Sequence, residues 1–354
     1  MRKSLSRLCV FLFILALPVL AQAAASDLPK VHILATGGTI AGQAASSSNL
    51  TGYQAGVLTP EQLIGAVPAL ADHARISAEQ IASIASGNIT KEIWLQIANR
   101  INELFAKGEA DGVVITHGTD TLEETAYFLQ LAVKSDKPVV LVGAMRPASA
   151  ISADGPLNLL QAVAAAASPE AKGKGVFIIM NGEINCAREV TKTSTTSVET
   201  FKSHDLGFMG YMINTTPKFY RLSSRRHTVN SEFDVKGLKT LPNVEIIYSY
   251  IHPNLDMLKA LVASKPDGIV VAGTGSGSMY GGYDEILGEA AKAGIPVICA
   301  SRVGTGPVSL YPQYQKLNFI SADNLNPQKA RVLLMMALTK TKDFTEIDRI
   351  FKEY

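Results

Sequence analysis

The sequence predicts an α/β protein with two α/β domains: a larger N-terminal domain whose mostly parallel sheet is flanked by helices, and a smaller C-terminal parallel-sheet domain. Short β-branched runs alternate with helical patterns from residue 31 onward, as in βαβ units. The strand-like runs are continuously apolar, which is typical of strands covered on both faces. The alternation lapses once, from about Arg221 to Pro242, and then resumes, which indicates two domains.

Five strands and four helices are predicted in the first domain, which we place at 27–220. The strands are Val31–Ala35, Gln80–Ser83, Gly112–Ile115, Val139–Val142 and Val176–Met180. The helices are Thr59–Val67, Thr90–Ala106, Asp120–Val133 and Pro156–Ala167. The third helix begins with Thr121-x-x-Glu124, the pattern of a capping box, in which the two side chains bond the free backbone N–H groups of the helix start.

The second domain, at 243–354, repeats the alternation on a smaller scale. Its predicted strands are Val244–Tyr248, Ile269–Ala272 and Ile295–Ala300, and its first helices are Leu255–Val262 and Tyr283–Lys292. Asn326-Pro327 is expected to cap a long helix ending near Thr341, and Asp343 to cap a last one. The segment 221–242 carries Arg221, Arg225, Arg226, Lys236 and Lys239, which favours a solvated linker between the domains.

Residues 1–23 have the composition of a signal peptide. Arg2, Lys3 and Arg7 precede the uncharged apolar stretch Leu8–Leu20, and Ala21-Gln22-Ala23 supplies the small residues of a cleavage site. The apolar stretch is shorter than the ~20 residues that a spanning helix needs. We therefore expect cleavage near Ala23, export to the periplasm and no membrane attachment after processing.

The charge and metal-ligating residues of the mature chain narrow the function classes. Removal of the three basic residues in the leader changes the formal net charge from +2 to −1, so there is no electrostatic reason to expect nucleic acid as a partner. The six histidines are scattered and the cysteines lack zinc-ligand spacing, so we expect no metal site and no cofactor. Cys186 and Cys299 are expected to be buried free thiols, although the compartment also permits a disulfide.

Two threonine-containing segments follow predicted strands of the first domain. One runs from Thr36 to Gly42 as Thr-Gly-Gly-Thr-Ile-Ala-Gly, and the other from His117 to Thr121 as His-Gly-Thr-Asp-Thr. Loops beyond the carboxyl ends of parallel strands gather at one edge of the sheet, so both can line one pocket. Neither segment has the glycine spacing of a dinucleotide or P-loop motif, and 273–278 fails both patterns too and is expected to be a tight turn.

Together, these two segments resemble the signatures of the L-asparaginase family. Further similar segments lie, in the family's order, at 123–128, 143–147, 152–156, 190–193 and 326–331. The resemblance covers essentially the whole mature chain, and with the leader it is similar to the exported type II branch. It implies an amidohydrolase that converts L-asparagine to L-aspartate and ammonia, with L-glutamine as a further candidate substrate. It also implies a homotetramer whose sites are shared between subunits.

The resemblance assigns catalytic roles to five residues. Thr39 would be the nucleophile that attacks the side-chain amide, and Tyr53, on a loop that closes over it, would help to take its proton. Thr119, Asp120 and Lys192 would form a second catalytic set. In that set Thr119 would position a water or serve the oxyanion, and Lys192 would keep it reactive. An uncharged amide needs such a nucleophile, base and oxyanion site.

Substrate binding is where the sequence departs from the family pattern. Asp120 would bind the α-ammonium and Ser86 the α-carboxylate, but Gly87 stands where the family commonly has glutamine or glutamate. His252 stands where a neighbouring subunit usually supplies asparagine, and Gln313 is the nearest counterpart of a missing glutamate. The loss of one charged partner in a buried site costs roughly 1.5–3 kcal/mol, so we expect weaker or altered recognition of the ammonium. His117 has no catalytic role in the family and is expected to be structural.

Three alternative interpretations accompany this one. A related amidotransferase subunit releases ammonia from glutamine in the cytoplasm, but it carries an extra N-terminal domain, whereas the core here begins at Val31. A periplasmic amino-acid-binding protein is also exported and also has two α/β domains, but it needs neither a nucleophile nor the Thr119 and Lys192 pair. The altered ammonium positions also allow a weakly active family member with an altered amide substrate.

Overall fold

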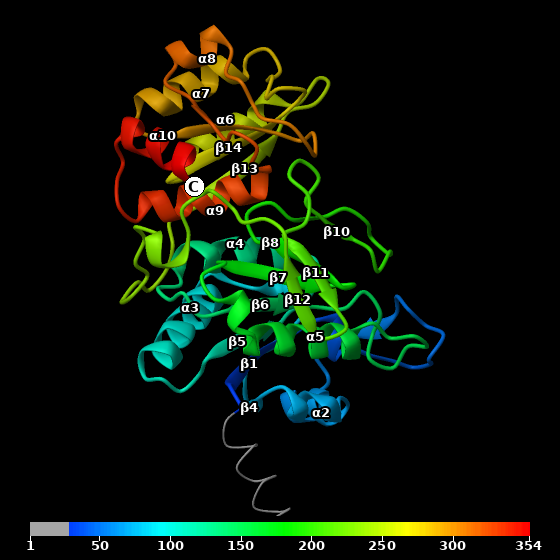
Figure 1. Ribbon diagram of the computed structural model, residues 1–354. Helices are drawn as coiled ribbons and strands as arrows, with labels where there is room; N and C mark the ends of the chain where they lie inside the picture. The colour runs from blue at the N-terminus through cyan, green and yellow to red at the C-terminus, as the bar shows by residue number, and fades with distance from the viewer. Residues whose placement is uncertain (1–27) are drawn as a thin grey trace, which may run out of the picture.

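The computed structural model describes residues 28–354, which form two main sheets surrounded by helices, together with two short two-stranded sheets (Figure 1). The larger sheet has eight strands in the order β12-β11-β8-β7-β6-β5-β1-β4, and the smaller has four in the order β13-β14-β15-β16. The predicted fold class is confirmed. The expected signal peptide at 1–23 lies outside the described residues.

Five strands of the larger sheet are parallel and overlap the predicted strands, although β4 begins at Arg75, well before the predicted start at Gln80. They are β4 (Arg75–Ile84), β1 (Lys30–Gly37), β5 (Gly112–Thr116), β6 (Val139–Val142) and β7 (Val176–Met180). The sequence did not indicate the antiparallel extension beyond β7. It consists of β8 (Glu183–Cys186), β11 (Gly210–Ile213) and β12 (Thr216–Phe219). These strands are short, and β11 alternates buried with exposed residues, so they lack the apolar runs of the parallel strands.

Helices cover both faces of the larger sheet. On one face lie α3 (Lys91–Ala106) and α4 (Leu122–Ala132), and on the other α2 (Pro60–Gly65) and α5 (Gly155–Ala167). Successive residues of each strand point to opposite faces, so Ile115 and Leu141 pack with the first pair of helices while Val114 and Val140 pack with the second. This layering leaves the carboxyl ends of the strands free to carry a site.

The smaller sheet is wholly parallel. Its strands are β13 (Val244–Tyr248), β14 (Gly268–Gly273), β15 (Val297–Ser301) and β16 (Ile320–Ser321). The helices of this part are α6 (Leu255–Ala263), α7 (Tyr283–Lys292), α8 (Pro312–Lys316), α9 (Pro327–Leu338) and α10 (Phe344–Glu353). Asn326 caps α9 and Asp343 caps α10 as predicted, but α9 ends at Leu338, before the expected end near Thr341.

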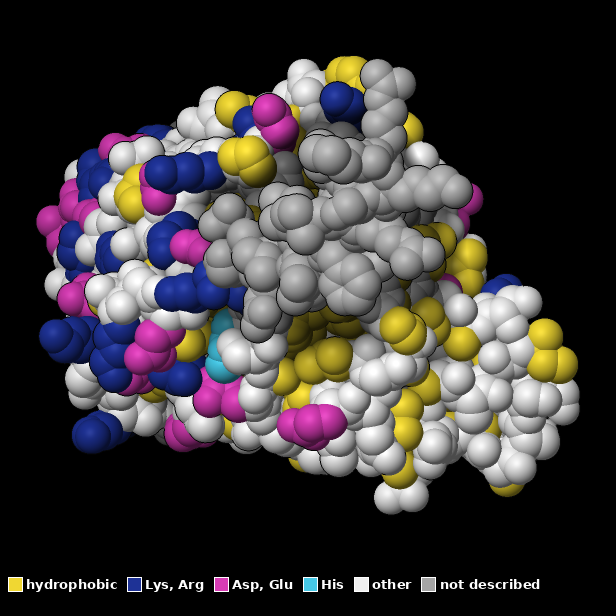
Figure 2. All heavy atoms as spheres, turned by 60° about the horizontal axis from the view of Figure 1, so that its bottom comes forward, with side chains coloured by type: hydrophobic (Ala, Val, Ile, Leu, Met, Phe, Trp, Pro, Cys, Tyr) yellow, Lys and Arg dark blue, Asp and Glu magenta, His cyan; other side chains and the backbone are white. Residues whose placement is uncertain are grey.

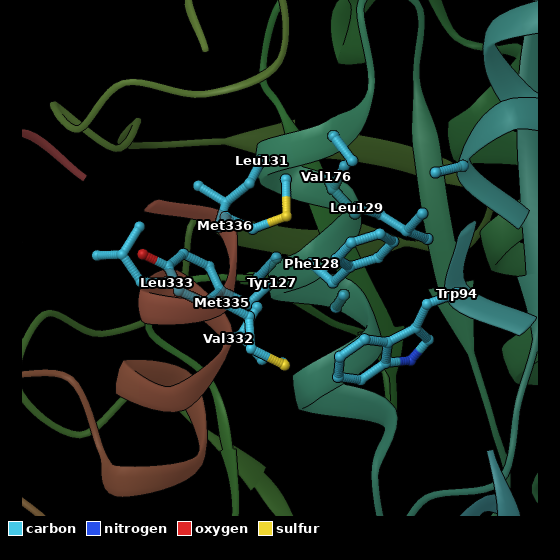
Figure 3. Packing of buried hydrophobic residues seen from close by; sticks show 14 of the residues in the cluster. Trp94, Tyr127, Phe128, Leu129, Leu131, Val176, Val332, Leu333, Met335 and Met336 are labelled. Carbon is cyan, nitrogen blue, oxygen red and sulfur yellow. The ribbon is translucent and has the colours of Figure 1, made fainter. Parts of the chain in front are cut away.

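The two parts share one hydrophobic core. Helix α9 lies against β13 and β14 of the smaller sheet and also against α4 of the larger domain. In Figure 3 the side chains of Val332 and Met335 on α9 lie close to those of α4, and both helices belong to one buried cluster. Farther along this cluster Trp94 stacks on Phe128 with 5.1 Å between ring centroids. The position of α9 is thus fixed by apolar packing on both sides.

The prediction of a solvated linker is wrong for much of 221–242. Phe233, Val235 and Leu241 are buried in the shared core. The arginines at the start of the segment are half-buried and paired: Arg225 donates to Asp323 at 2.6 Å, and Arg226 to Glu353 at 2.6 Å. The sequence pattern shows the basic residues but not the acidic partners, which come from distant parts of the chain.

The predicted capping box at the start of α4 is also wrong. Thr121 occupies the N-cap position, but its side chain makes no capping bond and its hydroxyl donates to the carbonyl of Ser86 at 2.8 Å. Glu124 is largely buried, and burial raises its pKa to about 7. A tertiary contact has therefore taken the place of the local one.

The surface carries charges of both signs, and both cysteines in the described part of the chain are buried, as the sequence predicted. Lys and Arg side chains lie interspersed with Asp and Glu on the left of the face shown in Figure 2. Over residues 28–354, no helix is both long enough and apolar enough to cross a membrane. Cys186 and Cys299 are free and buried, as expected, and belong to different hydrophobic clusters.

The shared core predicts the stability of a truncation variant. Met336 is fully buried in the cluster that joins α4 and α9. We expect Met336→Ala to lower the free energy of unfolding by about 2–5 kcal/mol, because it leaves a cavity in packed surroundings. Val229→Ala, at a site that is 53% exposed, is the control, with an expected change of less than about 0.5 kcal/mol. Urea unfolding followed by fluorescence measures both, and equal stabilities would contradict the shared core.

Candidate active site

The two threonine loops meet at the carboxyl edge of the larger sheet. Strands β1 and β5 are parallel neighbours, with Ala35 opposite Thr116, so the loops that follow them leave the sheet side by side. Their backbones touch: a Cβ atom built on Gly38 would lie 2.3 Å from the Cα of Gly118, and Gly38 has a φ of 78°. No side chain fits at Gly38. The predicted convergence of the two loops is thus present in the structure.

A tyrosine hydroxyl lies directly on Thr39. The hairpin of β2 (Gln43–Ala44) and β3 (Tyr53–Gln54) brings the Tyr53 Oη to 2.6 Å from the Thr39 Oγ1, and either hydroxyl can donate. The chain after the hairpin is anchored to the Thr39 loop, since the Gly56 N–H donates to the Gly38 carbonyl at 3.1 Å. The ring also rests on Gly42, where a Cβ would lie 2.8 Å from the ring. This pair can pass a proton from Thr39 to the phenol oxygen.

The second loop carries a threonine beside a lysine and an aspartate. The Lys192 Nζ donates to the Thr119 Oγ1 at 2.9 Å and to the Asp120 Oδ1 at 2.6 Å. Lys192 lies on β9 (Thr191–Lys192), a short strand paired with β10 (Phe201–Lys202). Its side chain is 18% exposed, whereas that of Asp120 is 74% exposed and faces solvent. The ammonium can stabilise negative charge near Thr119, and Asp120, which is mostly exposed, keeps a second carboxylate oxygen that can accept from a cation.

Ser86 and Gly87 lie at the same edge. They begin a 3-10 turn, Ser86–Asn88, that follows β4, the other neighbour of β1. Ser86 is buried against the second loop: a Cβ on Gly118 would lie 2.8 Å from its Oγ. Gly87 is exposed, and a Cβ built on it meets nothing within 4 Å. The structure therefore gathers Ser86, Gly87, Thr119 and Asp120 in one place.

His252 and Gln313 are not part of this gathering. His252 follows β13 in the second domain with a φ of 53°, and its ring nitrogen lies 3.4 Å from the Tyr280 hydroxyl. Gln313 is exposed on α8. Within residues 28–354, no hydrogen bond links either residue to the threonine loops.

A buried hydrogen-bond chain supports the second loop. The Trp94 indole donates to the Thr125 hydroxyl at 2.8 Å, and that hydroxyl lies 3.0 Å from the His117 Nε2. The Gly118 carbonyl, 2.7 Å from the His117 Nδ1, can only accept, so Nδ1 carries the proton and Nε2 of a neutral ring accepts from Thr125. Burial lowers the pKa of His117 to about 4, so the ring is neutral near pH 7. These contacts fit the structural role expected for His117.

Glu123 is the residue that the sequence analysis missed at this site. Its side chain is buried at the start of α4, and its Oε2 accepts the backbone N–H of Lys192 at 2.6 Å. The Oε1 accepts from the side chains of Asn326 at 3.1 Å and Gln328 at 2.6 Å. Its one sequence signal is a place among the segments that resemble the family. Nothing in the pattern distinguishes it from its neighbour Glu124.

Comparisons with known proteins place these features in context. Residues 30–225 match the family model "Asparaginase, N-terminal" and residues 243–351 match "Glutaminase/Asparaginase C-terminal domain". The chain is 48% identical to the "Probable L-asparaginase periplasmic" of Haemophilus influenzae, over 93% of this chain and 94% of that one. It is 47% identical to the "Glutaminase-asparaginase" of Pseudomonas fluorescens, over 96% of each.

A solved structure is also similar to this chain, both in fold and in sequence. The crystal structure of a "Probable Cytoplasmic L-asparaginase" from Campylobacter jejuni superposes with a TM-score of 0.90. The two chains share 52% sequence identity, over 92% of this chain and all of the other.

Proposed function

The chain belongs to the asparaginase family, and on that premise we propose that it is an exported enzyme that hydrolyses L-asparagine with Thr39 as its nucleophile. The observation that carries this proposal is the 2.6 Å contact between the Thr39 and Tyr53 hydroxyls, at the same sheet edge as Thr119 and Lys192. The Thr39 hydroxyl has the Tyr53 oxygen beside it as a proton acceptor, and the Thr119 hydroxyl has the Lys192 ammonium beside it. Acyl transfer from an amide needs both kinds of support.

The reaction proceeds in two steps, acylation of Thr39 and hydrolysis of the resulting ester. In the first, the Thr39 oxygen attacks the side-chain amide carbon and its proton moves to the Tyr53 oxygen, while Tyr53 gives up its own hydroxyl proton. That proton reaches the amide nitrogen as the C–N bond breaks and ammonia leaves. The product is an ester between aspartate and Thr39. In the second, a water held by Thr119 attacks the ester carbon, and Thr39 recovers its proton as L-aspartate departs. The Lys192 ammonium, bonded to Thr119, stabilises the negative charge that develops as that water attacks the ester.

Substrate binding falls to Ser86 and Asp120. Asp120 is mostly exposed, so its carboxylate can receive the α-ammonium, and the buried Ser86 lies within reach of the α-carboxylate. The open space at Gly87 offers no side chain to the ligand. We therefore expect this site, in which Asp120 binds the ammonium without a second polar side chain at residue 87, to have a lower affinity for the α-ammonium than a site with such a side chain. L-glutamine is a further candidate substrate, as the name of the Pseudomonas relative suggests.

We also propose that a second subunit completes the site. His252 lies far along the chain from Thr39, on a surface where Tyr248, Tyr250 and Ile251 are exposed, the last at 93%. Such apolar side chains favour a protein interface. A homotetramer would bring His252 and Gln313 of a neighbour towards the threonine loops.

The altered residues at the ammonium-binding positions also favour an alternative function. The protein would then be a periplasmic amino-acid-binding protein, or a weakly active family member with an altered amide substrate.

Ammonia release tests the activity and the nucleophile together. Purified protein is expected to release ammonia from L-asparagine, and Thr39→Ala and Thr119→Ala are each expected to lower kcat by at least about 100-fold. Thr216→Ala, at an exposed threonine of β12, is the control and should keep full activity. Near-normal turnover by Thr39→Ala would exclude Thr39 as nucleophile, and absence of turnover by the wild type would favour the binding protein.

A substitution at Gly87 tests the account of ammonium binding. Gly87→Gln is expected to lower KM for asparagine more than it changes kcat, because it adds binding away from the reacting carbon. Gly65→Gln, at another glycine where a Cβ would meet nothing within 4 Å, is the control. Steady-state kinetics on asparagine, glutamine and an analogue without the α-amino group measure the effect. A low wild-type KM that Gly87→Gln raises would instead indicate that His252 has reshaped the pocket for a larger amide.

The leader is tested by the start of the mature chain. Expressed with residues 1–23 in a Gram-negative host, the protein is expected in the osmotic-shock fraction with an N-terminus near Ala24. Substitution of Ala23 by a bulky residue should slow processing. N-terminal sequencing decides the matter, and a full-length chain recovered with cytoplasmic markers would refute export.

A further inference from the structure

Lys192 stands on an element that is weak by itself. Strand β9 has two residues and pairs only with β10, with Lys192 opposite Phe201 and Thr191 opposite Lys202. An isolated two-stranded ribbon is marginally stable in water. A long flexible side chain on such a ribbon loses its position if the backbone shifts. The 2.9 Å contact of Lys192 with Thr119 therefore needs support from outside the ribbon.

That support comes first from the buried carboxylate of Glu123. Only 3% of this residue is exposed, and its two oxygens accept three hydrogen bonds, from the Lys192 backbone N–H and from the side chains of Asn326 and Gln328. A buried carboxylate is expensive unless such donors surround it. Asn326 caps α9 and Gln328 lies in its first turn. Glu123 thus joins three segments: the start of α4, β9 and the start of α9.

The same turn of α9 supplies a buried ammonium. Lys329 is 1% exposed, and its Nζ donates to the carbonyl of Arg188 at 3.0 Å and to that of Val190. These carbonyls lie on the segment that leads directly into β9. Burial lowers the pKa of Lys329 to about 8, while the negative charge of Glu123 opposes that shift. The backbone that carries Lys192 is therefore held by a buried negative and a buried positive group.

We propose that Glu123 and Lys329 are positioning residues for Lys192, through which the first turn of α9 in the second domain holds the second catalytic set in place. This inference rests on the proposed function, because it assumes that Lys192 acts in the chemical step. Neither residue contacts Thr119 or Asp120 by a hydrogen bond in the described part of the chain. Their effect on turnover must pass through the backbone of Lys192.

Glu123→Gln is the most direct test, because it keeps the shape of the side chain. Three donors face Glu123, and the amide has only one oxygen to offer them, so its NH₂ group must face another donor. We expect kcat on asparagine to fall about tenfold while KM changes less than about twofold, as for an interaction used only in the chemical step. Lys329→Met is expected to give the same pattern.

The matched control is Glu124→Gln, the same chemical change at the next residue of the same helix. Glu124 is influenced by Arg331 and makes no hydrogen bond to β9 within residues 28–354. Its kcat should stay within about twofold of the wild type, as for a site that does not couple to Lys192.

A double-mutant cycle with Lys192→Met separates positioning from general structural support. If Glu123 acts through Lys192, then Glu123→Gln should change kcat less than about twofold once Lys192 is absent. The same tenfold loss in both backgrounds would show an independent structural role and overturn the proposal. Normal kcat in Glu123→Gln would overturn it too, and normal kcat in Lys329→Met would remove Lys329 from it.

A second variant, Gln328→Ala, and the activity of the wild type complete the test. If Glu123→Gln does not fold, Gln328→Ala removes one of the three donors and should lower kcat about threefold only when Lys192 is present. A loss that does not depend on Lys192 would again overturn the proposal. A wild-type protein without asparaginase activity would instead refute the proposed function, whereas an active wild type with an unaffected Glu123→Gln would refute the positioning role alone.

Discussion

The close approach of the Gly38 and Gly118 backbones is the constraint on which the candidate site depends. Parallel pairing of β1 with β5 sets the two loops side by side, and the absence of side chains at the contact lets them touch. The hairpin that carries Tyr53 is then anchored to the Gly38 carbonyl, and Ser86 packs against Gly118. A Cβ atom at Gly38 would separate the loops, and with them the two threonines.

Two carboxylates three residues apart show how burial divides the work of this region. Asp120 precedes α4 and is mostly exposed, with one hydrogen bond from Lys192, so part of its acceptor capacity remains for a ligand. Glu123 lies in the first turn of α4, buried, and all of its bonds go to the protein. The carboxylate of Asp120 is therefore accessible to a ligand, whereas that of Glu123 is enclosed by hydrogen-bond donors of the protein.

The second domain contributes to the site through its packing as well as through any contact with a neighbouring subunit. Apolar packing holds α9 against α4, and the polar first turn of the same helix reaches the segment that carries Lys192. The apolar part of α9 contributes most of the stability, and the hydrogen bonds of its first turn fix the position of the segment that carries Lys192. Helix α9 therefore links the core between the domains to the segment that carries Lys192.

Local patterns in the sequence were enough to predict the inner parallel strands, from their continuous apolar runs, the caps of α9 and α10, and the threonine segments at strand ends. They did not reveal β11 and β12, whose short alternating pattern becomes a strand only beside a partner. Three features became visible only in the folded chain: Thr121 bonds to Ser86 instead of capping its helix, the arginines after residue 220 are paired, and Glu123, not Glu124, accepts the backbone N–H of Lys192. Each of these depends on groups distant in the chain, and a hydrogen bond or ion pair is fixed by where its partner lies in space.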